Sequence, residues 1–400
     1  MTHEPLLSDQ LPLPPFFDPE NGARWGYSPD QEALFERATA WRRERQIAPA
    51  GTDRLDLQLL VIDAQKDFCF PQGNLYVGGR SGTGAVEDTK RLASFIYRNL
   101  DRITGITATM DTHFAYQIFF ASFWLDELGL PLTPHTIIHT DDIRDGRVRP
   151  NPDIAWWLCD GDYPWLQRQV AYYTAELERG GKYELYLWPP HCLLGSDGHA
   201  LAGVIHEARL FHSYVRAAQS LVEIKGGNPL TENYSALGAE VLTRFDGGPL
   251  ARKNERLIAA LLGADVVVIA GQAASHCVKS SIDDLLGEIL GRDTALARKV
   301  YILADCMSAV TVPDGSGGFL ADFTPQAEAA LDCYRAAGMH VVASTTPIAA
   351  WPEIGGHLAR ADGPRRRGPS AQAVVRPDEG PLGTPDGGLD TEIAGMGERR

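Results

Sequence analysis

The sequence predicts an open, doubly wound α/β domain, a parallel sheet with helices on both faces. Between about residues 57 and 345, short apolar runs that end in polar residues alternate with longer segments of helical periodicity. Unbroken apolar runs are typical of parallel strands, because both faces of such a sheet are buried. Ligands of such sheets bind beyond the carboxyl ends of the strands. We therefore look for functional residues where the apolar runs end.

The predicted elements follow this alternation in order. Six strands are expected at residues 57–63, 103–111, 221–226, 266–271, 299–306 and 339–345. Crossover helices are expected at residues 86–100, 254–263, 278–290 and 324–338. The last helix has Thr324 as its expected N-cap and Pro325 at the first helical position.

The chain is expected to have an N-terminal extension, 1–55, and a main domain, 56–350. The extension is Pro-rich at first and then turns helical, with Ser28 as the expected N-cap, Pro29 in the first turn and Glu32 shortly after. We expect this helix to pack against the main domain.

The main domain contains an insertion at about 114–220, which is too long for a simple crossover and is rich in aromatic residues. We expect it to lie over the carboxyl edge of the sheet, as a lid or an oligomer contact. Residues 351–400 are rich in Gly and Pro and have little apolar content, so we expect a disordered tail. We interpret the short basic cluster at 365–367 as part of this solvated tail.

The composition excludes several functional classes. The 44% of hydrophobic and 22% of charged residues are typical of a globular protein. The net charge of −15 disfavours nucleic-acid and membrane-surface partners, and no run of about 18 apolar residues predicts a membrane span. The sequence opens without a basic segment followed by an apolar one, so we expect a soluble, cytoplasmic protein. The six cysteines are far apart, which argues against a disulfide framework.

Cys277 is the first candidate for chemistry. It follows the apolar run 266–271 through the connector QAASH and opens a helical segment. The positive end of a helix dipole favours a thiolate, and nearby backbone N–H groups can bind an oxyanion. The alternative interpretation is that Cys277 is a small buried hydrophobic residue.

Asp63 and Lys225 end two other apolar runs. A carboxylate beside buried chain can have a raised pKa and act as a general acid or base. Taken singly, Asp63 is more readily explained as a turn cap and Lys225 as a solvated charge. The arrival of Asp, Lys and Cys at one crevice from three strand ends is harder to explain by chance than any one of them alone.

Asp111, His113 and His191 are candidate metal ligands. Alternate residues of an extended segment project to the same side, so Asp111 and His113 can face one ion together. One carboxylate and two imidazoles suit zinc, iron or manganese in a catalytic site with open positions. A hydrogen-bonded histidine pair is the alternative, because His191 lies far from His113 in the sequence.

Five motifs give the chain, from about 57 to 345, a resemblance to the isochorismatase-like cysteine hydrolases, and most of all to their nicotinamidase branch. They are DAQKDF at 63–68, DTH at 111–113, WPPHC at 188–192, KGGNPLTENYSA at 225–236 and GQAASHCV at 271–278. The resemblance implies an open, Rossmann-like sheet of six parallel strands. It also implies hydrolysis of nicotinamide to nicotinate and ammonia, through a thioester on Cys277, as a step of pyridine nucleotide biosynthesis.

The resemblance also implies roles for individual residues. Asp63, Lys225 and Cys277 would form the catalytic triad, and Asp111, His113 and His191 would bind a divalent metal, zinc before iron or manganese. The N–H groups of Ala273 and Cys277 would form the oxyanion hole, next to a cis peptide between Gln272 and Ala273. Phe68 and Trp188 would sandwich the pyridine ring, and His276 would flank the same pocket.

Two departures from the family pattern affect these expectations. The interval from His113 to His191 is much longer than in small nicotinamidases, so the roof of the pocket does not carry over. Some relatives have a further histidine after the Asp-x-His motif, and the segment FAYQIFFASF has none. Isochorismatases proper lack the metal trio and cleave a vinyl ether, so the trio favours amide hydrolysis.

Two alternatives to a nicotinamidase-like activity stay open. Another amidase of the same superfamily, acting on a carbamoyl, ureido or other small amide, would use the same triad. A non-catalytic scaffold would keep the fold without needing an activated thiol. Family members often self-associate, and the aromatic residues of the insertion would permit a homo-oligomer.

Overall fold

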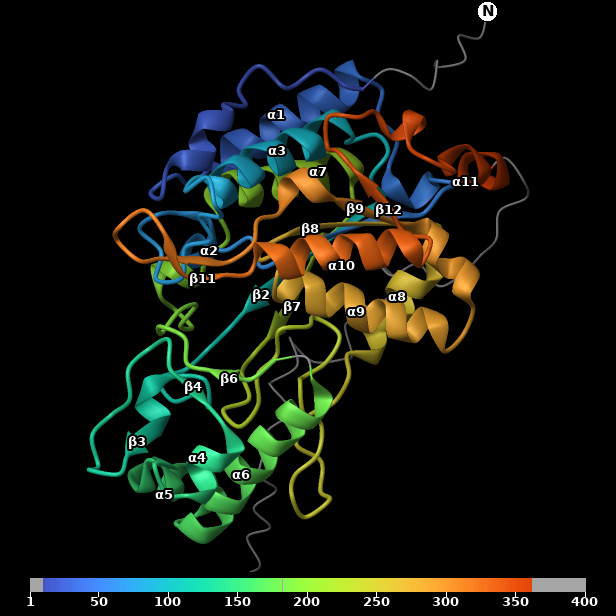
Figure 1. Ribbon diagram of the computed structural model, residues 1–400. Coiled ribbons are helices and arrows are strands. Elements are labelled where there is room, and N and C mark those ends of the chain that lie inside the picture. The colour runs from blue at the N-terminus through green and yellow to red at the C-terminus, as the bar shows by residue number, and fades with distance from the viewer. Residues whose placement is uncertain (1–9, 182, 362–400) are drawn as a thin grey trace, which may run out of the picture.

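The six predicted strands form one parallel sheet in the order β12-β9-β8-β1-β2-β7. The computed structural model describes residues 10–181 and 183–361. Helices cover both faces of the sheet (Figure 1), which confirms the predicted fold class. The strands are β1 (Leu57–Ile62), β2 (Gly105–Asp111), β7 (Leu221–Lys225), β8 (Val266–Gly271), β9 (Val300–Leu303) and β12 (His340–Val342).

Alternate side chains of the central strands supply two separate cores. Leu57, Leu59 and Val61 of β1 are buried in the core shared with the helices α1, α3 and α7. Leu60 and Ile62 point to the opposite face, toward the helices α8, α9 and α10. The helices are α1 (Gln31–Glu44), α3 (Gly84–Arg98), α7 (Gly203–Arg216), α8 (Glu255–Gly263), α9 (Cys277–Leu290) and α10 (Thr324–Ala336). Because both faces of β1, β8 and β9 are buried, these strands read as the unbroken apolar runs seen in the sequence.

The chain adds strands to the sheet in two opposite directions, starting from the neighbouring strands β1 and β8. From β1 the chain continues outward to β2 and β7, and it then crosses back to β8, β9 and β12 on the other side of β1. The carboxyl ends of β1, β2, β7 and β8 therefore meet around this switch point, where open α/β sheets bind ligands. The short helix α2 (Lys66–Cys69) follows β1 at the same edge.

The N-terminal helix α1 packs against α7, as expected of the extension. It begins at Gln31, and Asp30 is its N-cap, whose side chain accepts a hydrogen bond from the Ala33 N–H at 3.1 Å. The start expected at Ser28 and Pro29 lies too early, because the carboxylate of Asp30 caps the helix. At the other end of the domain, α10 starts at Thr324 with Phe323 at the N-cap position, one residue before the expected cap.

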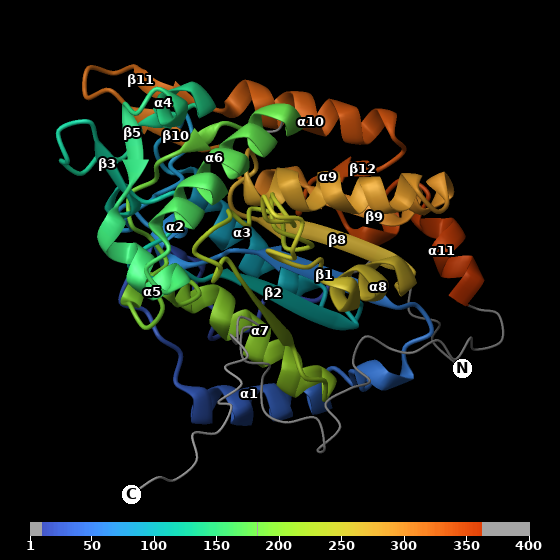
Figure 2. The ribbon, with the colours of Figure 1, turned by 90° about the horizontal axis from the view of Figure 1, so that it is seen from below.

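The insertion forms a lobe of its own beside the sheet (Figures 1 and 2). It has a separate apolar core and consists of β3 (Trp124–Asp126), β4 (Ile137–Ile138), α4 (Thr140–Arg144), β5 (Val148–Pro150), α5 (Ala155–Cys159), α6 (Tyr163–Gly180) and β6 (Leu185–Tyr186). The expected end at residue 220 is too late, because α7 packs on α1 and α3 and is the crossover helix to β7.

Residues 351–361 do not follow the prediction of a disordered tail. Trp351 is buried and stacks on Phe95 and Tyr301, with ring centroids 5.9 and 5.0 Å apart. The helix α11 (Ile354–Ala361) comes next. The rest of the predicted tail, including the basic cluster at 365–367, lies outside the described residues.

A hairpin of β10 (Thr311–Pro313) and β11 (Phe319–Asp322) precedes α10. Among the described residues, none of the helices has the length and apolar character that crossing a membrane requires.

Candidate active site

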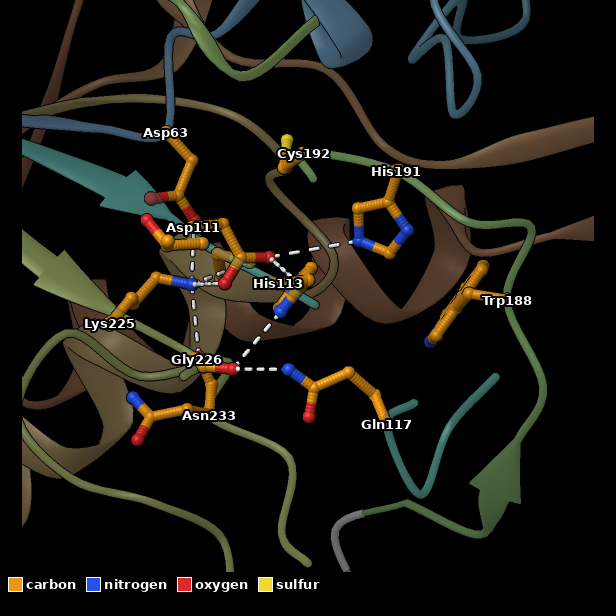
Figure 3. Close-up of polar contacts among 12 residues, drawn as sticks. Asp63, Asp111, His113, Gln117, Trp188, His191, Cys192, Lys225, Gly226 and Asn233 are labelled. Atoms are coloured by element: carbon orange, nitrogen blue, oxygen red, sulfur yellow. Dashed lines mark hydrogen bonds and ion pairs between the residues drawn. The ribbon is translucent and has the colours of Figure 1, made fainter. Parts of the chain in front are cut away.

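Asp63, Lys225 and Cys277 meet at the carboxyl edge of the sheet. Asp63 directly follows β1, Lys225 is the last residue of β7, and Cys277 opens α9 after β8. Lys225 Nζ lies 2.9 Å from Asp63 Oδ2 and 3.7 Å from Cys277 Sγ. All three side chains are buried. The structure thus brings together the three residues that the sequence singled out, of which Figure 3 labels Asp63 and Lys225.

Thr109 fixes the orientation of Asp63. The Asp63 N–H donates to Thr109 Oγ1 at 3.0 Å, and Thr109 Oγ1 donates to Asp63 Oδ1 at 2.5 Å. Asp63 has a positive φ of 44°. The sequence analysis did not single out Thr109. It lies two residues before Asp111 on β2, so the alternation of the strand could have placed it beside the site.

The buried triad is not a preformed thiolate pair. Burial and the neighbouring carboxylate of Asp63 raise the pKa of Cys277 well above its ordinary value, although Lys225 opposes this shift. Cys277 does lie at the start of α9, as expected, but its burial raises the pKa of its thiol. Burial also raises the pKa of Asp63, with Lys225 again opposing. The raised pKa of Cys277 favours its thiol form, and the raised pKa of Asp63 makes its carboxylate a stronger acceptor for the thiol proton.

Lys225 carries the positive charge of this cluster. Burial by itself lowers the pKa of Lys225, but Asp111 and Asp63 outweigh it and hold that pKa well above the usual range. Lys225 Nζ also donates to the Asn233 carbonyl at 2.9 Å and to Asp111 Oδ1 at 3.0 Å. The ammonium group therefore bridges Asp63 to Asp111.

Asp111, His113 and His191 form a second cluster beside the first. His113 Nε2 lies 2.8 Å and His191 Nε2 lies 3.7 Å from Asp111 Oδ2. The other ring nitrogens face backbone carbonyls, His113 Nδ1 that of Gly226 at 3.1 Å and His191 Nδ1 that of Pro189 at 2.8 Å. A carbonyl only accepts, so each Nδ1 is the ring nitrogen that donates to the backbone, and each Nε2 is the nitrogen that faces Asp111.

This donor set fits a divalent metal. The three ligand atoms lie within 4.8 Å of one another and are buried. Burial lowers the pKa of His191, which keeps its ring in the neutral form that binds metals. Two imidazole nitrogens and a carboxylate oxygen face the same point, and a divalent cation bound there would take all three as ligands. The carbonyls behind the two Nδ1 atoms are the supports that metal-binding histidines usually have.

Gly226 and Gln117 belong to the surroundings of this cluster, although the sequence analysis did not single them out. The Gly226 carbonyl accepts from both Gln117 Nε2 and His113 Nδ1 at 3.1 Å. Gly226 has a φ of 86°, and a Cβ there would lie 2.6 Å from Asp111 Oδ1. Gly226 directly follows Lys225 in the sequence, and this neighbourhood could have identified it beforehand as part of the site. In place of the further histidine of some relatives, Phe119 and Phe120 pack against the His113 ring.

The loop before Cys277 has the backbone form that the resemblance implied. The peptide between Gln272 and Ala273 is cis. In the part of the chain that the structure describes, neither the Ala273 N–H nor the Cys277 N–H has a hydrogen-bond acceptor. The Gln272 side chain donates to Asp88 Oδ2 at 2.9 Å, which ties the loop to α3. Two N–H groups beside the thiol are thus available to a ligand oxygen.

Aromatic residues surround the site on the side of the insertion. Phe68 packs on His191, and Trp188 packs on His276, with ring centroids 5.4 and 5.2 Å apart. The rings of Tyr183 and Phe323 also contact His276. Burial lowers the pKa of His276 to about 3, so its ring is neutral. The structure therefore places Phe68, Trp188 and His276 in a largely apolar, aromatic setting.

Comparison with known proteins gives one curated relative. The chain is 28% identical over 131 residues to the nicotinamidase of Escherichia coli strain K12, a match that covers 31% of this chain and 47% of the relative. The matched segment thus spans about half the length of that relative. No family model matches the chain.

Solved structures that the comparison finds include a yeast nicotinamidase bound to the inhibitor nicotinaldehyde, at 18% identity and a TM-score of 0.43, covering 72% of this chain and 99% of that one. Another is a nicotinamidase and pyrazinamidase of Acinetobacter baumanii, at 18% identity and a TM-score of 0.42, covering 72% of this chain and 97% of that one. A pyrazinamidase of Pyrococcus horikoshii in complex with zinc has a TM-score of 0.38 at 18% identity, covering 72% of this chain and 99% of that one.

The motifs that carry the resemblance are thus not scattered over the molecule. DAQKDF, DTH, WPPHC, the segment after β7 and the loop before Cys277 all reach one edge of the sheet, and the curated sequence relative is a nicotinamidase. The chain is thus similar in part of its sequence to a nicotinamidase, and the motifs by which it resembles the isochorismatase-like cysteine hydrolases lie together in the fold.

Proposed function

We propose that the protein is a cysteine amidohydrolase that cleaves a small carboxamide, with nicotinamide as the first candidate substrate. The observation that carries this proposal is the contact of one buried ammonium group with both a carboxylate and a thiol, at 2.9 and 3.7 Å. A binding module has no use for such a cluster, whereas nucleophilic catalysis needs a thiol with a base beside it.

In this mechanism Asp63 accepts the proton of Cys277, and Lys225 stabilises the charges that result. The sulfur attacks the carboxamide carbon, and a tetrahedral oxyanion forms. The N–H groups of Ala273 and Cys277 donate to that oxygen, a contact whose loss typically costs about a hundredfold or more in rate.

The second half of the reaction returns the proton. Asp63 hands it to the departing nitrogen, the carbon–nitrogen bond breaks, and ammonia leaves. A thioester remains on Cys277. A water molecule, deprotonated by Asp63, then cleaves the thioester, which releases the carboxylic acid and restores the thiol.

Asp111, His113 and His191 are the residues that would hold a divalent metal, with zinc as the first candidate. Bound there, the ion would supply Lewis-acid polarisation of a substrate nitrogen or of water. Asp111 also accepts from Lys225, so the ligands of this metal and the catalytic ammonium group share one carboxylate. Phe68, Trp188 and His276 would hold an aromatic ring beside the thiol.

Ammonia release measured with nicotinamide, pyrazinamide and N-carbamoyl compounds tests the proposal. We expect release from nicotinamide by the wild-type protein. Cys277→Ala should abolish it without loss of fold, and Cys333→Ala, at an exposed cysteine, should not affect it. Release from the carbamoyl compounds alone would assign the activity to another amide, and turnover by Cys277→Ala would exclude a covalent step.

A further inference from the structure

A chain of hydrogen bonds links the insertion lobe to Trp188. Trp188 Nε1 donates to Tyr234 Oη at 2.8 Å, and Tyr234 Oη donates to Glu232 Oε1 at 2.6 Å. Tyr173 Oη donates to the second carboxylate oxygen of Glu232 at 2.9 Å. The Glu232 N–H donates back to Tyr173 Oη at 2.9 Å. We call these four residues the Glu232 relay.

The direction of the relay is set by the indole. An indole N–H can only donate, so Tyr234 Oη must accept from Trp188 and its own proton must go to Glu232. The Glu232 carboxyl group then receives one hydroxyl proton at each oxygen. Because Glu232, Trp188 and Tyr173 are all buried, an interrupted relay leaves a polar group without a partner.

The relay joins three separate parts of the fold. Tyr173 lies on α6 of the insertion, Trp188 follows β6, and Glu232 and Tyr234 lie in the segment that also carries Lys225. The indole N–H of Trp188 is already hydrogen-bonded to Tyr234 within the protein, and this bond fixes the plane of the ring. The ring in turn packs edge to face on His276, with an interplanar angle of 85°.

We propose that Glu232 is a positioning residue. Through Tyr234 it holds the Trp188 ring in the orientation in which that ring packs against the ring of the substrate. Tyr173 ties the insertion into this arrangement, so the insertion helps to set which small carboxamides fit beside Cys277. This inference rests on the proposed function for its substrate, but the ordering of Trp188 is independent of it.

Glu207 offers a matched control. It is also a buried glutamate whose two carboxylate oxygens accept from two tyrosine hydroxyls, those of Tyr27 and Tyr97. It lies on α7, away from the relay. Glu232→Gln and Glu207→Gln therefore remove the same kind of contact at two places, only one of which reaches Trp188.

The first measurement does not depend on activity. In protein labelled with ¹⁵N at its tryptophans, the Trp188 indole resonance is assigned by its loss in Trp188→Phe. We expect that resonance to shift in Glu232→Gln and in Tyr234→Phe and to stay in place in Glu207→Gln. An unmoved resonance in both relay variants would overturn the proposal, whether or not the protein proves to be an amidase.

The second measurement is steady-state kinetics with nicotinamide and pyrazinamide. The loss of one net hydrogen bond predicts a rise in KM of about fivefold or more for Glu232→Gln. We expect a smaller change in kcat and an altered preference between the two substrates, while Glu207→Gln keeps the wild-type KM. Equal changes of KM and kcat in the two glutamine variants would mean that Glu232 has only a structural role. Absence of turnover in the wild-type protein would instead count against the proposed function.

Discussion

At the residue scale, Asp111 is the point that the two clusters share. One of its oxygens accepts from Lys225 and the other faces both histidines. Burial by itself raises the pKa of Asp111, but His113 and Lys225 outweigh it and hold that pKa well below the usual range. Asp111 is therefore a permanent carboxylate, which is the form that a metal requires.

The donor set predicts that the purified protein binds about one equivalent of a divalent metal, in keeping with a three-residue catalytic site. His191→Ala should lower the bound metal severalfold, because it removes one of two imidazole ligands. His199→Ala is the matched control, since His199 lies in the same part of the chain but contacts Thr112 instead. Elemental analysis of the three proteins measures this directly. A metal content that is equal in both variants, or absent from the wild-type protein, would exclude the site.

The electrostatics of Cys277 show why a residue cannot be assessed from its position on a helix alone. Its place at the start of α9 favours a thiolate, yet burial and Asp63 raise its pKa. In the proposed mechanism, the thiol becomes a nucleophile only as its proton moves to Asp63, whose own pKa burial has raised. Proton transfer and attack are in this way coupled to each other.

At the element scale, the end of β7 is where the backbone is least tolerant of change. Gly226 has a φ of 86°, and its added Cβ would lie 2.6 Å from Asp111 Oδ1 and 2.7 Å from His113 Cε1. The end of β7 therefore places the Lys225 side chain beside Asp63 and Cys277, and the Gly226 carbonyl beside His113. Only a residue without a side chain lets both clusters approach β7 this closely.

We predict that Gly226→Ala destabilises the fold and also lowers metal binding. Gly247 is the matched control, because its φ of 81° is similar but nothing lies within 4 Å of its added Cβ. Gly247→Ala should show only the cost of the backbone conformation, about 1–3 kcal/mol in the free energy of unfolding. Gly226→Ala should exceed that cost and lose metal, as urea unfolding and metal analysis would show. Equal costs and retained metal would mean that the clusters shift aside freely.

At the scale of the whole molecule, one buried histidine makes the stability of the fold depend on pH. His212 on α7 packs in the interior, with Nε2 2.9 Å from the Ile103 carbonyl. Its Nδ1 is buried without a hydrogen-bond partner among the described residues. Burial lowers the pKa of His212 to about 4, because a proton on Nδ1 would have no acceptor.

This shift predicts a loss of stability in mild acid. The unfolded chain binds a proton at His212 below about pH 6.5, whereas the folded protein does so only below about pH 4. Within that window the unfolded state holds more protons, so falling pH lowers the free energy of unfolding, by about 3 kcal/mol in all. Urea unfolding at a series of pH values should show a smaller slope for His212→Gln than for the wild-type protein. An unchanged slope in His212→Gln would contradict the prediction.

The sequence by itself determined the fold and the chemistry of the site. Unbroken apolar runs such as 57–63 and 266–271 can be buried only in a sheet covered on both faces, and the polar residues at their ends must then meet at one edge. This is why Asp63, Lys225 and Cys277 could be named before any coordinates.

Only the tertiary structure decided the features that depend on contacts between segments far apart in the sequence. Three examples are the pKa of Cys277, the support that Thr109 and Gly226 give to the two clusters, and the relay from α6 to Trp188. The same is true of the boundaries at 203 and 351, where α7 and Trp351 are held by packing against the sheet. The burial of single polar groups and the formation of long-range hydrogen bonds have no local signature, because they exist only once segments far apart in the chain have come together.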